Sequence, residues 1–132
     1  GSVIDARAVA TPLRFARVEC KVPDAAFRTR HYSMTKAAID SLTRSMALEL
    51  GAHGIRTNAV CPTVVLTALG RAAWADPAKV KPMLASVPLG RLAEPEDIAD
   101  AILWLLSARA GMVNGVMLPV DGGFIGTRAQ LP

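Results

Sequence analysis

The residues of this chain with the clearest chemical potential are Tyr32 and Lys36, which lie in the run Tyr-Ser-Met-Thr-Lys. Four residues apart on a helix, the two side chains share a face, so the ammonium of Lys36 can lie near the phenol of Tyr32. A free tyrosine has a pKa near ~10, and a nearby cation stabilises the phenolate and lowers that pKa. The pair therefore predicts a phenol that exchanges a proton near neutral pH, although the same spacing is also found on ordinary solvated helix faces.

Other residues with chemical potential lie in weaker patterns. His31 and His53 have no cysteine or acidic residue at ligand spacing, so we expect no metal site. Ser41 and Ser45 have no histidine placed to activate them and are interpreted as small residues that allow close helix packing. Trp74 is interpreted as a packing residue, with the lining of a substrate pocket as the alternative.

The composition is that of an ordinary soluble domain or part of one, with 132 residues that are 52% hydrophobic, 20% charged and 5% aromatic. No apolar run approaches the ~18 residues that a membrane-spanning helix needs, and the first residues lack the pattern of a signal peptide. Cys20 and Cys61 are too few for a disulfide framework. We therefore expect a cytoplasmic protein with no membrane span and with reduced cysteines, Cys61 being buried.

The formal net charge of +4 raises the question of a nucleic-acid partner. Six of the fifteen basic residues fall in the first thirty positions, where three acidic residues oppose them. The six are Arg7, Arg14, Arg17, Lys21, Arg28 and Arg30. A nucleic-acid-binding module would need these side chains in a stripe with interleaved aromatic residues, of which this segment has only Phe15 and Phe27. We therefore expect no nucleic-acid partner.

The regular part of the sequence begins at His31. Apolar or small residues then recur every four positions, which is the spacing of a helix: Met34, Ala38, Leu42, Met46 and Leu50. Gly51 and Gly54 are expected to end this helix. Residues 55–60 predict a short strand, closed at Pro62 because proline interrupts a central ladder.

Three further segments follow this strand. Residues 63–93 contain three prolines and are interpreted as a long excursion with short helical pieces. A helix is expected from Glu94 to near Gly111, with a proline and two acidic residues in its first turn, and residues 116–120 predict a last strand. Upstream, residues 1–5 are compatible with a short strand, whereas residues 6–30 show no sustained period and are predicted to be irregular.

Strand, helix, strand, helix, strand is the order of a right-handed parallel α/β sheet. A doubly wound sheet of this kind normally also carries a glycine-rich phosphate loop, and no G-x-G-x-x-G cluster occurs in this chain. We therefore predict the C-terminal part of a Rossmann-like doubly wound parallel sheet, its strands 5 to 7 with their helices. Residues 31–132 would belong to this single domain, and residues 1–30 would be a divergent irregular segment.

In order and spacing, these motifs resemble the short-chain dehydrogenase/reductase family. Tyr32 and Lys36 resemble its active-site helix, residues 58–67 resemble its Asn-x-Val-x-Pro-Gly-x-x-x-Thr segment, and the Leu-Pro-Val-Asp-Gly-Gly-Phe run at residues 118–124 resembles its closing strand. The resemblance covers residues 31–124. Within the family, residues 62–65, 74–77, 88–90 and 118–120 are most similar to the branch of tetrameric reductases that act on keto sugars and other carbonyl compounds.

The resemblance implies reduction of a ketone or keto sugar with NADP or NAD, NADP being favoured. Tyr32 would be the catalytic proton donor, and Lys36 would hold the nicotinamide ribose and lower the pKa of Tyr32, so both would be catalytic and cofactor-binding residues. Val65 would bind the nicotinamide carboxamide through its main chain, and the Thr67 hydroxyl would approach the pyrophosphate or the carboxamide. By pattern alone, Val64 and Val65 favour core packing instead.

Two positions depart from the family pattern. Position 63 is threonine, where the family usually has glycine. The keto-sugar branch also has threonine in place of this glycine. No serine lies between Ser2 and Tyr32, where the family carries a catalytic serine, and losing such a donor typically costs on the order of 10² or more in rate. A catalytically inactive oligomerisation domain of the same fold therefore remains the alternative. For the complete protein we expect a homo-oligomer, a tetramer, with a small carbonyl substrate.

Overall fold

The computed structural model describes residues 14–18 and 29–125, with side chains from residue 34 to residue 125. The elements in chain order are β1 (Arg14–Val18), α1 (Thr29–Gly51), β2 (Arg56–Pro62), α2 (Ala68–Ala73), α3 (Pro77–Ala85), α4 (Pro95–Leu106), the 3₁₀ turn η2 (Ala108–Ala110) and β3 (Met117–Val120). Among the helices of this described part, none is both long and apolar enough to span a bilayer.

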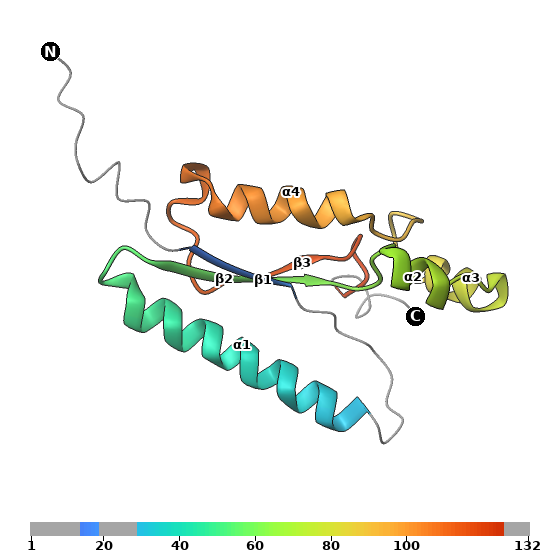
Figure 1. Ribbon diagram of the computed structural model, residues 1–132, viewed down its shortest axis with the longest axis horizontal. Helices are drawn as coiled ribbons and strands as arrows, with labels where there is room; N and C mark the ends of the chain where they lie inside the picture. Colours follow the sequence, from blue (N-terminus) through green and yellow to red (C-terminus); the bar gives the residue numbers. More distant parts are fainter. Residues whose placement is uncertain (1–13, 19–28, 126–132) are drawn as a thin grey trace, which may run out of the picture.

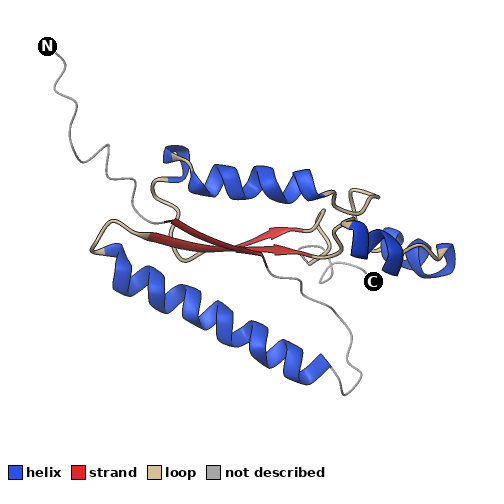
Figure 2. Cartoon of the chain, viewed as in Figure 1, coloured by secondary structure: helices blue, strands red, loops and turns tan. Residues whose placement is uncertain are grey.

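The described strands form one parallel sheet in the order β1-β2-β3, with β2 in the middle. Helix α1 covers one face of the sheet and α4 covers the other, as Figures 1 and 2 show. With helices on both faces, every residue of β2 is buried. The predicted doubly wound parallel sheet is confirmed.

The connections β1-α1-β2 and β2-α4-β3 cross the sheet in the same direction, but their helices lie on opposite faces (Figure 1). Two such connections have opposite hands, so one of them departs from the right-handed rule for parallel strands. The prediction of right-handed crossovers throughout is therefore wrong. The order of strands and helices in the sequence does not fix which face of the sheet each helix covers, and the two helices cover opposite faces.

Strand β1 lies at Arg14–Val18, inside the stretch that the sequence predicted to be irregular. It pairs in parallel with β2, from Arg14 opposite Arg56 to Val18 opposite Val60. The prediction is wrong for these five residues because the backbone of β2 supplies the partner, and the local sequence has no alternation that would signal a strand. The predicted strand at residues 1–5 lies outside the described residues.

The remaining predicted elements are confirmed to within a few residues, but the buried face of α1 is not the stripe with the four-residue spacing. Met34 and Leu42 are 68% and 52% exposed, respectively, whereas Thr43 and Ala47 are buried. Small side chains therefore lie on the buried face of α1, which packs against β2. The apolar stripe correctly predicts the helix, but part of this stripe lies on the outer face of α1, where large apolar side chains contact solvent.

The core lies between β2 and α4, where Val60, Ile98 and Leu105 form a buried cluster. Arg56 is also buried, and its guanidinium donates hydrogen bonds to the carbonyls of Leu105 (2.7 Å), Val113 (3.0 Å) and Ser107 (3.2 Å). Two of these carbonyls lie at the C-terminal end of α4, where a cation is favoured by the helix dipole. Arg56 thus ties the amino end of β2 to the end of α4.

Candidate functional site

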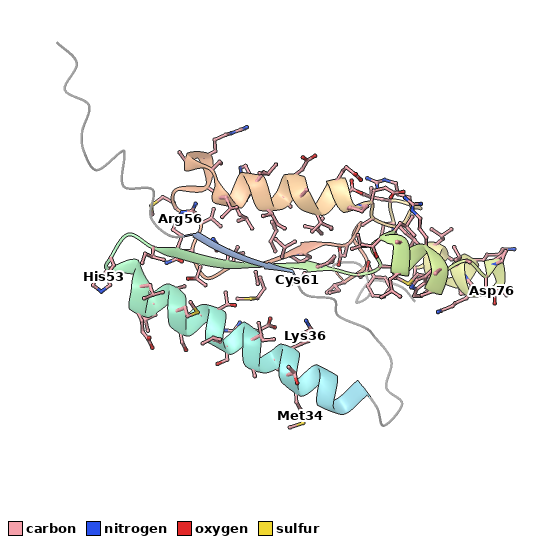
Figure 3. The ribbon with its side chains drawn as sticks, in the orientation of Figure 1. Met34, Lys36, His53, Arg56, Cys61 and Asp76 are labelled. Carbon is pink, nitrogen blue, oxygen red and sulfur yellow. The ribbon has the colours of Figure 1, made fainter. Side chains whose placement is uncertain are left out.

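Helix α1 runs antiparallel to the strands, so its first turns lie at the carboxyl end of β2 (Figure 1). Open parallel sheets bind ligands at this edge. Tyr32 lies in the first turns of α1, four residues before Lys36, as predicted; its side chain lies outside the described part. Lys36 is half-buried, and its side chain points from α1 toward the sheet (Figure 3).

In the segment after β2, the main-chain groups of Val65 point away from the strand-like partner that the neighbouring residues contact. Val65 forms an isolated parallel bridge with Ala93, in which Ala93 N–H donates to Val64 (3.2 Å) and Leu66 N–H donates to Ala93 (2.8 Å). In this pattern the N–H and C=O of Val65 itself point away from Ala93. The Val65 carbonyl accepts a hydrogen bond from Thr67 N–H at 2.9 Å. The Val65 N–H has no acceptor within the described residues.

Thr67 follows as the N-cap of α2. Its hydroxyl oxygen accepts a hydrogen bond from Gly70 N–H at 3.1 Å, which satisfies one of the free donors of the first turn. An oxygen that accepts this bond keeps its own hydrogen for another partner. The Val65 N–H and the Thr67 O–H are thus two neighbouring donors, and this donor set fits a carboxamide oxygen or a phosphate oxygen.

The excursion between β2 and α4 contains α2 and α3, and neither helix has a buried residue. Beneath them lies a cavity of about 390 Å³ whose apolar wall is formed by Leu66, Trp74, Val80, Leu84 and Leu92. The ammonium of Lys79 lies 4.5 Å from the ring centre of Trp74. Trp74 is half-buried, contacts Lys79 and lines this cavity, and the alternative that it lines a substrate pocket stays a prediction.

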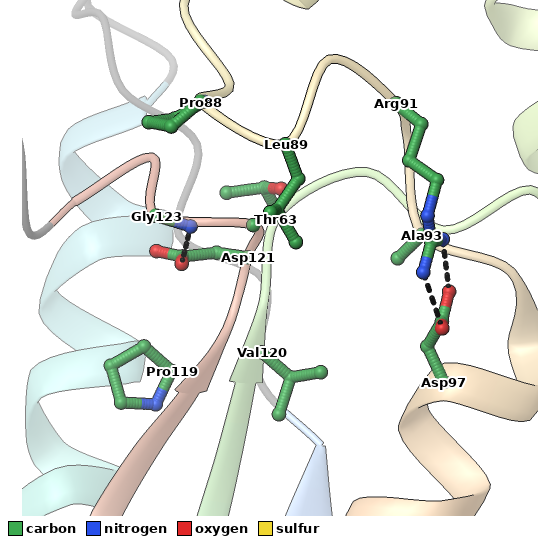
Figure 4. A pocket seen from close by; sticks show the side chains of 11 residues that line it. Thr63, Pro88, Leu89, Arg91, Ala93, Asp97, Pro119, Val120, Asp121 and Gly123 are labelled. Carbon is green, nitrogen blue, oxygen red and sulfur yellow. Dashed lines mark hydrogen bonds and ion pairs between the residues drawn. The ribbon is translucent and has the colours of Figure 1, made fainter.

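A second cavity, of about 490 Å³, lies between the loop at residues 88–91 and the closing turn after β3 (Figure 4). The buried carboxylate of Asp121 forms this turn, because its oxygens accept from Gly123 N–H (2.9 Å) and Ile125 N–H (3.0 Å). Leu89 N–H donates to the carbonyl of Gly122 at 3.2 Å. The turn therefore anchors the returning end of the excursion, a role that the sequence analysis missed.

An ion pair at the rim of this cavity was also missed. Both guanidinium nitrogens of Arg91 contact the two oxygens of Asp97, at 2.6 Å and 2.8 Å (Figure 4). These bonds, with a further one of 2.8 Å from Glu94 N–H, hold the pKa of Asp97 at about 2. The six-residue spacing of Arg91 and Asp97 follows no helical rule, so no local signal identifies the pair.

The site residues predicted from the sequence thus lie in three separate parts of the chain. Lys36 comes from α1, Val65 follows β2, and Thr67 begins α2, and all three lie at the carboxyl edge of the sheet. Thr63, at the end of β2, is buried and lines the larger cavity. Within the described residues, no group of three or more histidine, cysteine or acidic side chains is close enough to hold a metal ion.

Comparison with known proteins identifies the family. The profile described as enoyl-(acyl carrier protein) reductase matches residues 18–125. The chain is 59% identical over 96 residues to L-xylulose reductase of Mus musculus, covering 73% of this chain and 39% of that protein. It is 47% identical over 94 residues to carbonyl reductase [NADPH] 2 of Sus scrofa, covering 71% and 38%. The chain therefore spans about two fifths of the length of these relatives.

A solved structure has the same arrangement of elements. Gluconate 5-dehydrogenase from Burkholderia cenocepacia, in complex with NADP and tartrate, superposes with a TM-score of 0.77 at 30% sequence identity. The superposition covers 92% of this chain and 49% of that one. From the profile match, the sequence identities and this fold, we conclude that the chain belongs to the short-chain dehydrogenase/reductase family.

Proposed function

We propose that this chain forms the C-terminal part of an NADP- or NAD-dependent oxidoreductase that reduces a ketone or keto sugar, with NADP favoured. The observation that carries the proposal is the Val65 peptide, whose N–H points away from its bridge partner at the sheet edge that also holds Lys36. Further support comes from the similarity to proteins named L-xylulose reductase and carbonyl reductase [NADPH].

Each site residue has a distinct role in this proposal. The nicotinamide supplies the hydride for the carbonyl carbon. Tyr32 donates the proton to the carbonyl oxygen, and the ammonium of Lys36 lowers the pKa of the phenol and binds the ribose. The Val65 N–H donates to the carboxamide, and the Thr67 hydroxyl donates to the carboxamide or to the pyrophosphate.

We extend the proposal to the assembly and location of the complete protein. It would be a cytoplasmic homo-oligomer, a tetramer, without a nucleic-acid partner. Residues 31–132 would belong to one reductase domain, and residues 1–30 would be a divergent segment. The outer face of α1 supports an assembly of this kind, because Met34, Leu42 and Leu48 are 68%, 52% and 83% exposed, respectively.

A catalytically inactive oligomerisation domain is the second candidate function. Two observations favour it: no serine lies between Ser2 and Tyr32, and the exposed apolar side chains of α1 suit an interface. The two candidates differ in whether the site can support turnover once a complete reductase surrounds it.

A chimera tests whether the site residues of this chain can support turnover when the upstream segment comes from a complete reductase. Residues 31–125 of this chain would replace the matching segment of mouse L-xylulose reductase, and NADPH oxidation would be followed with L-xylulose and with a small α-dicarbonyl. We expect turnover within about tenfold of the mouse enzyme, because Tyr32, Lys36, Val65 and Thr67 would all be supplied by this chain. A folded, oligomeric chimera without turnover would favour the inactive domain.

A further inference from the structure

Gly70 lies in the first turn of α2, directly over the Val65 peptide. A Cβ atom built on Gly70 would come within 2.0 Å of the Val65 carbonyl oxygen and 3.1 Å of its carbonyl carbon. Real Cβ atoms essentially never approach another atom as closely as 2.0 Å, and the carbonyl oxygen is a backbone atom that cannot turn aside as a flexible side chain can. Only glycine therefore allows α2 to approach Val65 this closely.

The close approach joins two parts of the candidate cofactor site. Thr67 N–H donates to the Val65 carbonyl, and the Thr67 hydroxyl accepts from Gly70 N–H. Residues 65, 67 and 70 thus form one compact unit, in which the Val65 carbonyl is covered by the first turn of α2 and the Val65 N–H, in the preceding peptide group, points away from Ala93. A side chain at position 70 would separate α2 from Val65 and would displace Thr67 or rotate the Val65–Leu66 peptide, and with it the main chain of Val65.

We propose that Gly70 is a positioning residue for the cofactor site, because it seats the first turn of α2 on the Val65 carbonyl and so orients the Val65 N–H and the Thr67 hydroxyl. This inference rests on the proposed function, in which those two groups bind the nicotinamide half of the cofactor. Gly70 itself touches neither substrate nor cofactor in this proposal and acts through its two neighbours.

Helix propensity and this proposal predict opposite results for Gly70→Ala. Alanine is a better helix former than glycine, so a purely local view predicts an improved α2. We instead expect the KM and the Kd for NADPH to rise about tenfold or more in the chimera, with a smaller change in kcat at saturating NADPH. A general folding defect would lower the active fraction and the apparent kcat without raising KM.

Two further variants make the test specific. Gly51→Ala adds a Cβ at the end of α1, where its nearest neighbour is the Asn114 side chain at an ordinary 3.4 Å, and it should leave the KM for NADPH unchanged. Leu69→Gly loosens the same turn of α2 without a clash; Leu69 is 80% exposed, so the core stays intact. It should raise the KM in the same direction as Gly70→Ala.

The outcomes separate the two proposals. If the unsubstituted chimera turns over and neither Gly70→Ala nor Leu69→Gly changes the KM or Kd for NADPH, the positioning role is wrong and the proposed function stands. If the chimera binds NADPH without turnover, fluorescence titration of the variants still measures the effect on Kd. If the chimera does not bind NADPH at all, both proposals are overturned.

Discussion

At the scale of single residues, the candidate chemistry depends on a phenol and an ammonium placed by one helix. Tyr32 and Lys36 lie four residues apart in α1, and the side chain of Lys36 is directed to the sheet side of the helix. The Val65 segment, which follows β2, lies at the same edge of the sheet as the start of α1. In the proposed function the side chains of Tyr32 and Lys36 control the proton, whereas the main-chain N–H of Val65 binds the cofactor. Each residue therefore has its own expected effect when it is substituted.

Tyr32→Phe tests the proton donor. The substitution keeps the ring and removes the hydroxyl, so kcat of the chimera should fall by about 10² to 10⁴, the usual contribution of a positioned acid. Steady-state kinetics with saturating NADPH would measure the change. As a control, the Kd for NADPH should move far less than kcat; an unchanged kcat would eliminate the reductase mechanism proposed for this chain.

Lys36→Met tests the cation beside the phenol. Removing the ammonium should lower kcat and raise the pKa that controls the alkaline limb of the pH–rate profile, because a cation favours the phenolate. The profile of kcat/KM from about pH 6 to pH 11 would record the shift. A limb that stays in place while kcat falls would assign Lys36 to ribose binding alone.

At the scale of elements, buried polar groups hold the helices to the sheet. Arg56→Met keeps an apolar stem but removes the donor of the buried Leu105 carbonyl, whereas the Val113 carbonyl still accepts from the Asn58 side chain and the Ser107 carbonyl from Ala110 N–H. A buried acceptor left unpaired costs about 1–3 kcal/mol, so the free energy of unfolding of the chimera should fall by about that amount. Urea unfolding would measure it. Arg44→Met, at an exposed position of α1, is the matched control and should change stability by less than about 0.5 kcal/mol.

The start of α4 should respond to acid through Asp97. Its pKa is lowered from 3.8 to about 2 by Arg91 and by the N–H of Glu94. Because the pKa of Asp97 is lower in the folded chain, its charged carboxylate stabilises the fold at every pH above the pKa that Asp97 has in the unfolded chain. This contribution disappears as the pH falls from about 4 to about 2. The stability difference between the parent and Asp97→Asn should therefore shrink over that range in urea titrations. A difference independent of pH would show that the pair adds no stability.

At the scale of the whole molecule, the described part of the chain has an open strand edge and exposed apolar side chains that favour association. Among the described strands, β1 pairs with β2 only, so its other edge has no described strand beside it. Large apolar side chains are exposed on α1 and beyond α4, with Leu48 at 83% and Met112 at 99% exposed. Open strand edges and apolar patches both promote association.

The isolated 132-residue chain should therefore self-associate. Light scattering at tens of micromolar should give a mass above the 13.9 kDa of one chain, and the mass should fall on dilution. Leu42→Glu and Leu48→Glu on the outer face of α1 should reduce association if this face is the contact. A monodisperse monomer of the unsubstituted chain would contradict the expectation.

Local patterns in the sequence determine much of this protein. The four-residue spacing after His31 is sufficient for α1, because a helix satisfies its own backbone and needs no distant partner. The same holds for the start of α4, where Pro95 and the acidic residues suit the first turn. The pairing of Tyr32 with Lys36 follows from helix geometry alone, and the motif order was enough to identify the family.

Tertiary structure decided the features that depend on contacts with no signal in the local sequence pattern. Strand β1 exists because β2 supplies its backbone partner, and the outer stripe of α1 is exposed because Thr43 and Ala47 lie on the buried face, which packs against β2. The orientation of the Val65 peptide comes from its bridge to Ala93, and the need for glycine at position 70 comes from the approach of α2. Each of these depends on contacts between segments whose separation in the sequence carries no periodic signal, so only the folded chain determines them.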